Sequence, residues 1–179
     1  MKAIFIDLDG VTFTFKNILK GKAFFTPDVD LAVLRRLKNT KIVFVTSRSK
    51  SEFFKILNIT NLCFYVRNTI LFDNKVENIH NFVKANNIKK FVILDDDINL
   101  QLFFKNEVIL IDWYNGLTVH NFFGLLNKLK IKIKIFTSEK DFFINLGNIQ
   151  EQFVYLKMLL KHKCKTPNVF IKKVEFYES

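Results

Sequence analysis

The sequence has little of several features that mark particular protein classes. Only two cysteines, two prolines and five glycines occur among 179 residues. Cys63 and Cys164 lie far apart and neither belongs to a CxxC pair, so neither a disulfide framework nor a zinc site is expected. The scarcity of glycine and proline argues against a collagen-like chain, a low-complexity linker or a turn-rich β-sandwich.

Long hydrophobic runs are also lacking. No apolar stretch approaches the roughly 18 residues of a transmembrane helix. The first acid, Asp7, follows too few apolar residues for a signal-peptide core. We therefore expect a reduced, intracellular and cytoplasmic protein with no membrane association.

The chain is rich in apolar and basic residues. Hydrophobic residues make up 49% of it, including 22 phenylalanines, which is enough for a packed core in one domain. The 28 Lys and Arg outnumber the 17 Asp and Glu, giving a net charge of +11. Such a charge favours a polyanionic partner, although a solvated lysine-rich surface would give the same count.

Short apolar runs alternate with segments of helical periodicity. Runs without polar alternation are typical of strands buried on both faces, and strands that alternate with helices favour a parallel α/β sheet. We expect a Rossmann-like parallel sheet with flanking helices. The predicted strands are 3–8, 41–45, 91–94 and 108–111, with a weaker one at 63–66, and the predicted helices are 28–38, 49–57, 75–86 and 118–129.

The pattern changes after Lys130. Ile131, Ile133 and Ile135 alternate with lysines, which predicts a half-exposed strand with a basic face. A helix over 148–163 and a last strand over 168–177 follow. We place a boundary here, between a core of residues 1–130 and a small basic α+β appendage of residues 131–179.

Acidic residues end two of the predicted strands. Asp7 and Asp9 follow the first strand, and Gly10 permits the chain to turn away. Asp95 and Asp96 follow the strand at 91–94. Parallel strands bring their carboxyl ends together, and carboxylates so gathered suit Mg²⁺. The alternative is that these acids belong only to strand-end turns and helix caps.

Polar and basic residues end a third strand. Three polar or basic residues, Thr46, Ser47 and Arg48, follow the strand at 41–45 and open a helix. Free backbone N–H groups at a helix start can bind phosphate. The alternative is a helix N-cap that binds no ligand, because hydroxyl residues are common at N-caps. Lys75 opens the helix before the strand at 91–94. A lysine there could reach a phosphoryl oxygen, but any single lysine in this chain is more simply a surface residue.

Together these residues resemble the haloacid dehalogenase (HAD) superfamily, whose motifs are Asp-x-Asp, Thr or Ser, Lys or Arg, and an acidic pair. The matches are Asp7-Leu8-Asp9-Gly10-Val11, Thr46, Lys75 and Asp95-Asp96, and they span residues 1–112. The segments 91–97, Asp112 and 115–118 further resemble the HAD domain of "Swiss army knife" RNA-repair proteins. The short segments 11–27 and 58–74 leave no room for a cap domain.

The resemblance implies a mechanism. Asp7 would be the nucleophile, Asp9 the general acid and base, and Thr46 and Lys75 would hold the transferring phosphoryl group. Gly10, Ser47 and Arg48 would line the substrate site. Mg²⁺ would be held by Asp7, the backbone carbonyl of Asp9, and Asp95, with Asp96 as an alternative or supporting ligand.

The resemblance and the charge together indicate a magnesium-dependent phosphatase that acts on a macromolecule such as an RNA or DNA end. Two alternatives stay open: a phosphatase for small metabolites or phosphoproteins, and a catalytically idle HAD fold that binds nucleic acid.

Overall fold

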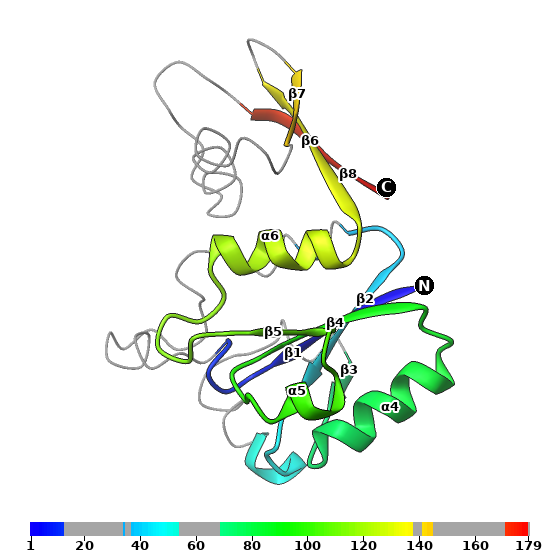
Figure 1. Cartoon of the computed structure of the whole chain (residues 1–179), viewed down its shortest axis with the longest axis vertical. Coiled ribbons are helices and arrows are strands. Elements are labelled where there is room, and N and C mark those ends of the chain that lie inside the picture. The colour runs from blue at the N-terminus through cyan, green and yellow to red at the C-terminus, as the bar shows by residue number, and fades with distance from the viewer. Residues whose placement is uncertain (13–33, 35–36, 54–68, 138–140, 145–170, 179) are drawn as a thin grey trace.

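The computed structural model describes residues 1–12, 34, 37–53, 69–137, 141–144 and 171–178 (Figure 1). Its centre is a five-stranded sheet in the order β3-β2-β1-β4-β5, in which all pairs of neighbours are parallel. This confirms the predicted α/β class with a parallel sheet. The strands are β1 (Lys2–Asp7), β2 (Thr40–Val45), β3 (Thr69–Leu71), β4 (Lys90–Asp95) and β5 (Val108–Leu110).

The central strand shows why these segments form strands. Ala3, Ile4, Phe5 and Ile6 are all fully buried, with alternate residues in two separate apolar clusters. Successive side chains of a strand point to opposite faces, so β1 is covered on both sides. Because both faces of β1 are buried, its sequence is a continuous apolar run without polar alternation.

Helices cover the two faces. Helix α6 (Val119–Lys128) packs on the face that contains Ile4 and Ile6, and α4 (Lys75–Ala85) and the short α5 (Leu100–Phe103) pack on the face that contains Phe5 (Figure 1). Side chains fix the starts of the two longer helices. Asn74 caps α4 by accepting from the Glu77 N–H, and Thr118 forms a capping box with Asn121 at α6.

The chain continues from α6 into a second, antiparallel sheet. Its order is β7-β6-β8, with β6 (Ile131–Thr137), β7 (Asp141–Ile144) and β8 (Ile171–Glu178). Ile133 of β6 is buried in the same apolar cluster as α6. The strand predicted from the alternation of Ile and Lys is therefore present, and its Ile133 packs into the apolar core of the parallel sheet and α6.

Other predictions differ or lie elsewhere. The short elements β3, α5 and β7 were not predicted, since three or four residues carry too little periodicity. The predicted strand at 63–66 and the predicted helix at 148–163 lie outside the described residues, as do most of the helix at 28–38 and the second half of that at 49–57. Across the part of the chain that is described, no helix combines the length and apolarity needed to span a bilayer.

The strand order places a topological switch point beside β1. The chain runs from β1 outward to β2 and β3, then returns to the other side of β1 with β4 and β5. In open α/β sheets, ligands bind beyond the carboxyl ends of the strands at such a point. Here that point lies between the ends of β1 and β4.

Candidate active site

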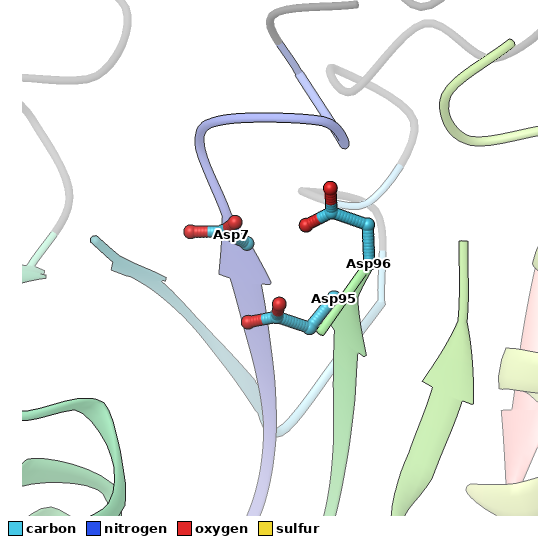
Figure 2. Close-up of side chains that lie close together, drawn as sticks. All are labelled: Asp7, Asp95 and Asp96. Carbon is cyan, nitrogen blue, oxygen red and sulfur yellow. The ribbon is translucent and has the colours of Figure 1, made fainter. Parts of the chain in front are cut away.

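Two buried aspartates lie at this switch point. Asp7 is the last residue of β1 and is 2% exposed, and Asp95 is the last residue of β4 and is fully buried. The register pairs Ile6 with Leu94, so the two aspartates follow side by side on neighbouring strands. Figure 2 shows their carboxylates together with that of Asp96, beyond the ends of the two strands.

Lys75 bridges the two aspartates. It is the first residue of α4, and its Nζ lies 3.1 Å from Asp7 Oδ2 and 3.0 Å from Asp95 Oδ2. The same ammonium also donates to Asp95 Oδ1 at 3.2 Å. Lys75, which was predicted as a site residue only from its order in the chain, is therefore in contact with both aspartates.

One carboxylate oxygen has no such partner. Asp7 Oδ1 is buried and accepts no hydrogen bond from any side chain or backbone group in the described part of the chain. Buried polar atoms are nearly always hydrogen-bonded, and an orphan calls for a specific explanation. A cation or a reacting group that contacts this oxygen would supply one.

The electrostatics of the cluster follow from burial. Desolvation, with the nearby charge of Asp95, raises the pKa of Asp7 to about 8 in spite of Lys75. Burial also raises the pKa values of Asp95 and Asp96. Burial alone would lower the pKa of Lys75, but the attraction of Asp7 and Asp95 outweighs it and the pKa is raised. Lys75 therefore stays an ammonium ion among carboxyl groups that resist ionising together.

Three carboxylates are placed to share a cation. Asp7, Asp95 and Asp96 each offer one oxygen, and these atoms all lie within 4.8 Å of one another. Carboxylate oxygens are the ligands that hard divalent cations prefer, and a cation between them would offset their repulsion. The donor set and the Asp7 Oδ1 atom that lacks a hydrogen-bond partner among the described residues are therefore compatible with a hard divalent cation.

Gly10 allows Asp96 to approach. Its backbone is left-handed, with φ of +76°, and a Cβ atom there would lie 2.2 Å from Asp96 Oδ2 and 2.4 Å from Asp96 Cγ. Both the conformation and the lack of space exclude a larger residue without rearrangement. Gly10 therefore does more than permit the predicted turn, because it makes room for a carboxylate at the site.

Asp9 is not one of the three clustered acids, although its charge contributes to the raised pKa values of Asp7 and Asp96. Its carboxylate accepts two hydrogen bonds from Arg48, from Nε and from the second terminal nitrogen, each at 2.8 Å. Thr46 is fully buried, and its Oγ1 accepts from the Arg48 N–H at 3.1 Å. Ser47 is exposed at the same strand end. The end of β2 thus brings a hydroxyl and a guanidinium beside the end of β1.

Sequence reasoning missed one feature near this edge of the sheet. Trp113 and Tyr114 lie three and four residues after the end of β5 and are 55% and 41% exposed. The available signal was the position of two large aromatic residues between Asp112 and Asn115-Gly116, a stretch with the composition of a turn. Aromatic residues in such a stretch have no strand or helix face to cover.

Comparison with known proteins found no match to any protein-family model, any curated protein or any solved structure. The assignment of this site therefore rests on its own geometry and on the motif resemblance.

Proposed function

We propose that this protein is a magnesium-dependent phosphatase of HAD type, with Asp7 as its nucleophile and a macromolecular phosphomonoester, such as a nucleic-acid end, as its substrate. The observation that carries the proposal is the environment of Asp7. One of its oxygens pairs with Lys75, the other is buried without a hydrogen-bond partner among the described residues, and two further carboxylates lie close by.

The raised pKa of Asp7 explains why a metal would be required. A carboxyl group with a pKa of about 8 is mostly protonated at neutral pH and is then a poor nucleophile. Bound Mg²⁺ would supply positive charge that favours the ionised carboxylate and reduces its repulsion from the phosphate. Asp7, Asp95 and Asp96 are the residues that would hold it.

The chain's own groups fit the two steps of such a reaction. Asp7 would attack phosphorus, forming an oxygen–phosphorus bond as the bond to the leaving oxygen breaks, and Asp9 would give that oxygen a proton. Water would then attack the aspartyl-phosphate while Asp9 takes its proton, releasing inorganic phosphate and restoring Asp7. Lys75, which contacts Asp7, and Thr46, which follows the neighbouring strand β2, would hold the phosphoryl oxygens.

A macromolecular substrate is favoured by two sequence features. The absence of a cap-sized segment predicts an open site, and the net charge of +11 favours a polyanion. Some of the basic residues lie away from the aspartates. Lys2 and Lys90 are register partners at the opposite, amino ends of β1 and β4, and the pKa of Lys90 is lowered by slight desolvation and by the charges of Lys130 and Lys2. These lysines lie at the edge of the sheet opposite to the aspartates, so the preference for a polyanion follows from the net charge of the whole chain.

The test is a phosphate-release assay on an aryl phosphate with Mg²⁺ or with a chelator. We expect activity that requires the metal and that Asp7→Asn abolishes, because an amide is not a nucleophile and lacks the metal-binding charge. Early time points matter, since slow deamidation would restore the acid. Equal activity of Asp7→Asn and the wild type would refute the covalent mechanism.

The substrate class needs a separate screen. Oligonucleotides phosphorylated at the 3′ or the 5′ end should be hydrolysed with a higher kcat/KM than sugar phosphates or phosphopeptides. A preference for the small substrates would favour the metabolite or phosphoprotein alternative. Binding of oligonucleotides without any phosphate release would favour the idle binding module.

A further inference from the structure

Two adjacent aromatic side chains stand out on the surface. Trp113 and Tyr114 are 55% and 41% exposed, and their rings meet edge to face with centroids 6.3 Å apart. Large aromatic side chains are usually buried for most of their area, so exposing two in succession forgoes stabilisation. Such exposure is common where a ligand covers the rings.

The loop that carries them is held by hydrogen bonds. Asp112 Oδ1 accepts from the N–H groups of Tyr114 at 2.8 Å and of Asn115 at 3.0 Å, and the Asp112 carbonyl accepts from the Gly116 N–H at 2.7 Å. Gly116 closes the turn with φ of +70°. Since the backbone is already fixed, a ligand that contacts the rings would pay little entropy for ordering the loop.

The loop lies at the same edge of the sheet as the candidate site. The Ile111 N–H donates to the carbonyl of Asp95 at 2.9 Å, and Trp113 is two residues further, at most about 7 Å along the chain. Parallel strands end at one edge, so this loop and the turn after β1 lie at the same edge of the sheet, with the end of β4 between them (Figure 1). A molecule whose phosphate contacts Asp7 would therefore extend over a surface that includes this loop.

We infer that Trp113 and Tyr114 form a stacking platform for an unpaired nucleobase of a nucleic-acid end whose phosphate is held at Asp7; this inference rests on the proposed function. An aromatic face next to a phosphoryl site matches the two parts of a nucleotide, a flat base and a charged phosphate. Stacking on an aromatic side chain tolerates every base, so the platform selects single-stranded ends and not a particular sequence.

The chain itself provides the probe for a direct test. Trp113 is its single tryptophan, so intrinsic fluorescence excited at the indole reports on this position alone. Titration with a short single-stranded oligonucleotide that lacks a terminal phosphate should quench the emission in a saturable manner. The same experiment with an abasic oligonucleotide of equal length keeps the backbone charge and removes the bases. Equal quenching by both, or no quenching by either, would overturn the inference.

Catalysis provides the second test. Trp113→Ala should raise KM for a phosphorylated single-stranded oligonucleotide about fivefold or more, and Trp113→Phe should restore most of that loss. For an alkyl phosphate, which has no ring to stack, kcat/KM of Trp113→Ala should stay within about twofold of the wild-type value, which is roughly the error of such assays. Phe103→Ala is the matched control. Phe103 is 59% exposed, much like Trp113, but it ends α5, before β5, and so lies outside the loop that follows β5.

The two proposals can fail separately. If the normal oligonucleotide quenches the fluorescence more than the abasic one but no substrate releases phosphate, the stacking platform is supported and the phosphatase is refuted. If the alkyl phosphate is hydrolysed but Trp113→Ala and Phe103→Ala have the same KM for the oligonucleotide, the phosphatase stands and the platform is refuted.

Discussion

Arg48 holds the carboxylate of Asp9 by a two-pronged hydrogen bond, with both distances at 2.8 Å. A planar guanidinium matches a carboxylate in this way, and the geometry fixes the orientation of the acid as well as its position. Both side chains are nearly half exposed, at 43% and 45%. Such an ion pair adds at most about 1 kcal/mol to stability, so its main effect is to position Asp9 at the edge of the site.

We therefore predict that Arg48→Lys impairs catalysis much more than folding. Lysine keeps the charge but presents one ammonium in place of two parallel N–H donors, so Asp9 would lose its fixed orientation. The kcat for an aryl phosphate should fall about 10- to 100-fold, as expected when a reacting group is misplaced by about an ångström. The melting temperature should stay close to that of wild type. A kcat for Arg48→Lys equal to that of wild type would show that the two-pronged hydrogen bond from Arg48 does not position Asp9 for catalysis.

A second prediction concerns pH and metal. The pKa of Asp7 rises from 3.8 to about 8 on folding, because the carboxyl group is buried. Between these two values the folded state binds a proton that the unfolded state has released, so the free energy of unfolding falls as pH rises. Asp95 and Asp96 shift in the same direction. In a chelator, the melting temperature should therefore fall from pH 5 to pH 8.

Mg²⁺ should reverse this loss. Because it competes with the proton for Asp7, it should raise the melting temperature more at pH 8 than at pH 5. In Asp7→Asn both the pH slope and the metal effect should shrink, since the amide does not titrate. The measurement is thermal unfolding at four pH values with chelator or Mg²⁺. An identical pH slope for wild type and Asp7→Asn would contradict the assignment of the raised pKa to this residue.

The third prediction uses two glycines in different settings. Gly10→Ala should lower activity severely and weaken Mg²⁺ binding, since the new Cβ would overlap Asp96 and strain the left-handed backbone. Gly124→Ala is the control. It lies inside α6, and its Cβ would make an ordinary contact at 3.5 Å with Ile109 Cδ1.

The control should behave in the opposite way. Alanine in the middle of a helix is favoured over glycine by about 0.5–1 kcal/mol, so Gly124→Ala should be slightly more stable and fully active. Full activity in Gly10→Ala would mean that Asp96 does not need the space beside Gly10. The assays are the magnesium dependence of phosphate release and thermal unfolding.

The sequence was informative where one strong pattern determines a structure. Continuous apolar runs predicted β1, β2, β4 and β5, and parallel pairing then required that Asp7 and Asp95 share one edge of the sheet. It was less informative about Lys75, because a long flexible side chain in a lysine-rich chain gives no pattern. Only the placement of α4 against the sheet brings its ammonium to both aspartates.

Other relationships depended on three-dimensional details that have no sequence period. The approach of Asp96 to Gly10 joins two turns that lie far apart in the sequence. The fork between Arg48 and Asp9 depends on the direction in which each chain leaves its strand. The exposure of Trp113 follows from the turn around Asp112, whereas aromatic residues elsewhere in the chain, such as Phe5 and Phe122, are buried.

The last prediction separates two neighbouring acids. Asp95 is fully buried and contacts Lys75, whereas Asp97 is exposed and its Oδ1 accepts from the Asn99 N–H at 2.9 Å. If Asp95 binds the metal, Asp95→Asn should raise the Mg²⁺ concentration for half-maximal activity about tenfold or more, by analogy with losses at metal sites. Asp97→Asn keeps the size of the side chain and lies outside the three-carboxylate cluster, so its midpoint should move less than about twofold.

A loss of stability could imitate a loss of metal, so unfolding in a chelator is the necessary companion measurement. Asp95→Asn removes one partner of Lys75, but Asp7 remains 3.1 Å from the ammonium and no longer faces a second buried charge. We therefore expect its melting temperature without metal to stay near that of wild type, while the gain on adding Mg²⁺ shrinks. A larger midpoint shift for Asp97→Asn than for Asp95→Asn would move the metal site two residues along the chain, away from the orphaned oxygen of Asp7.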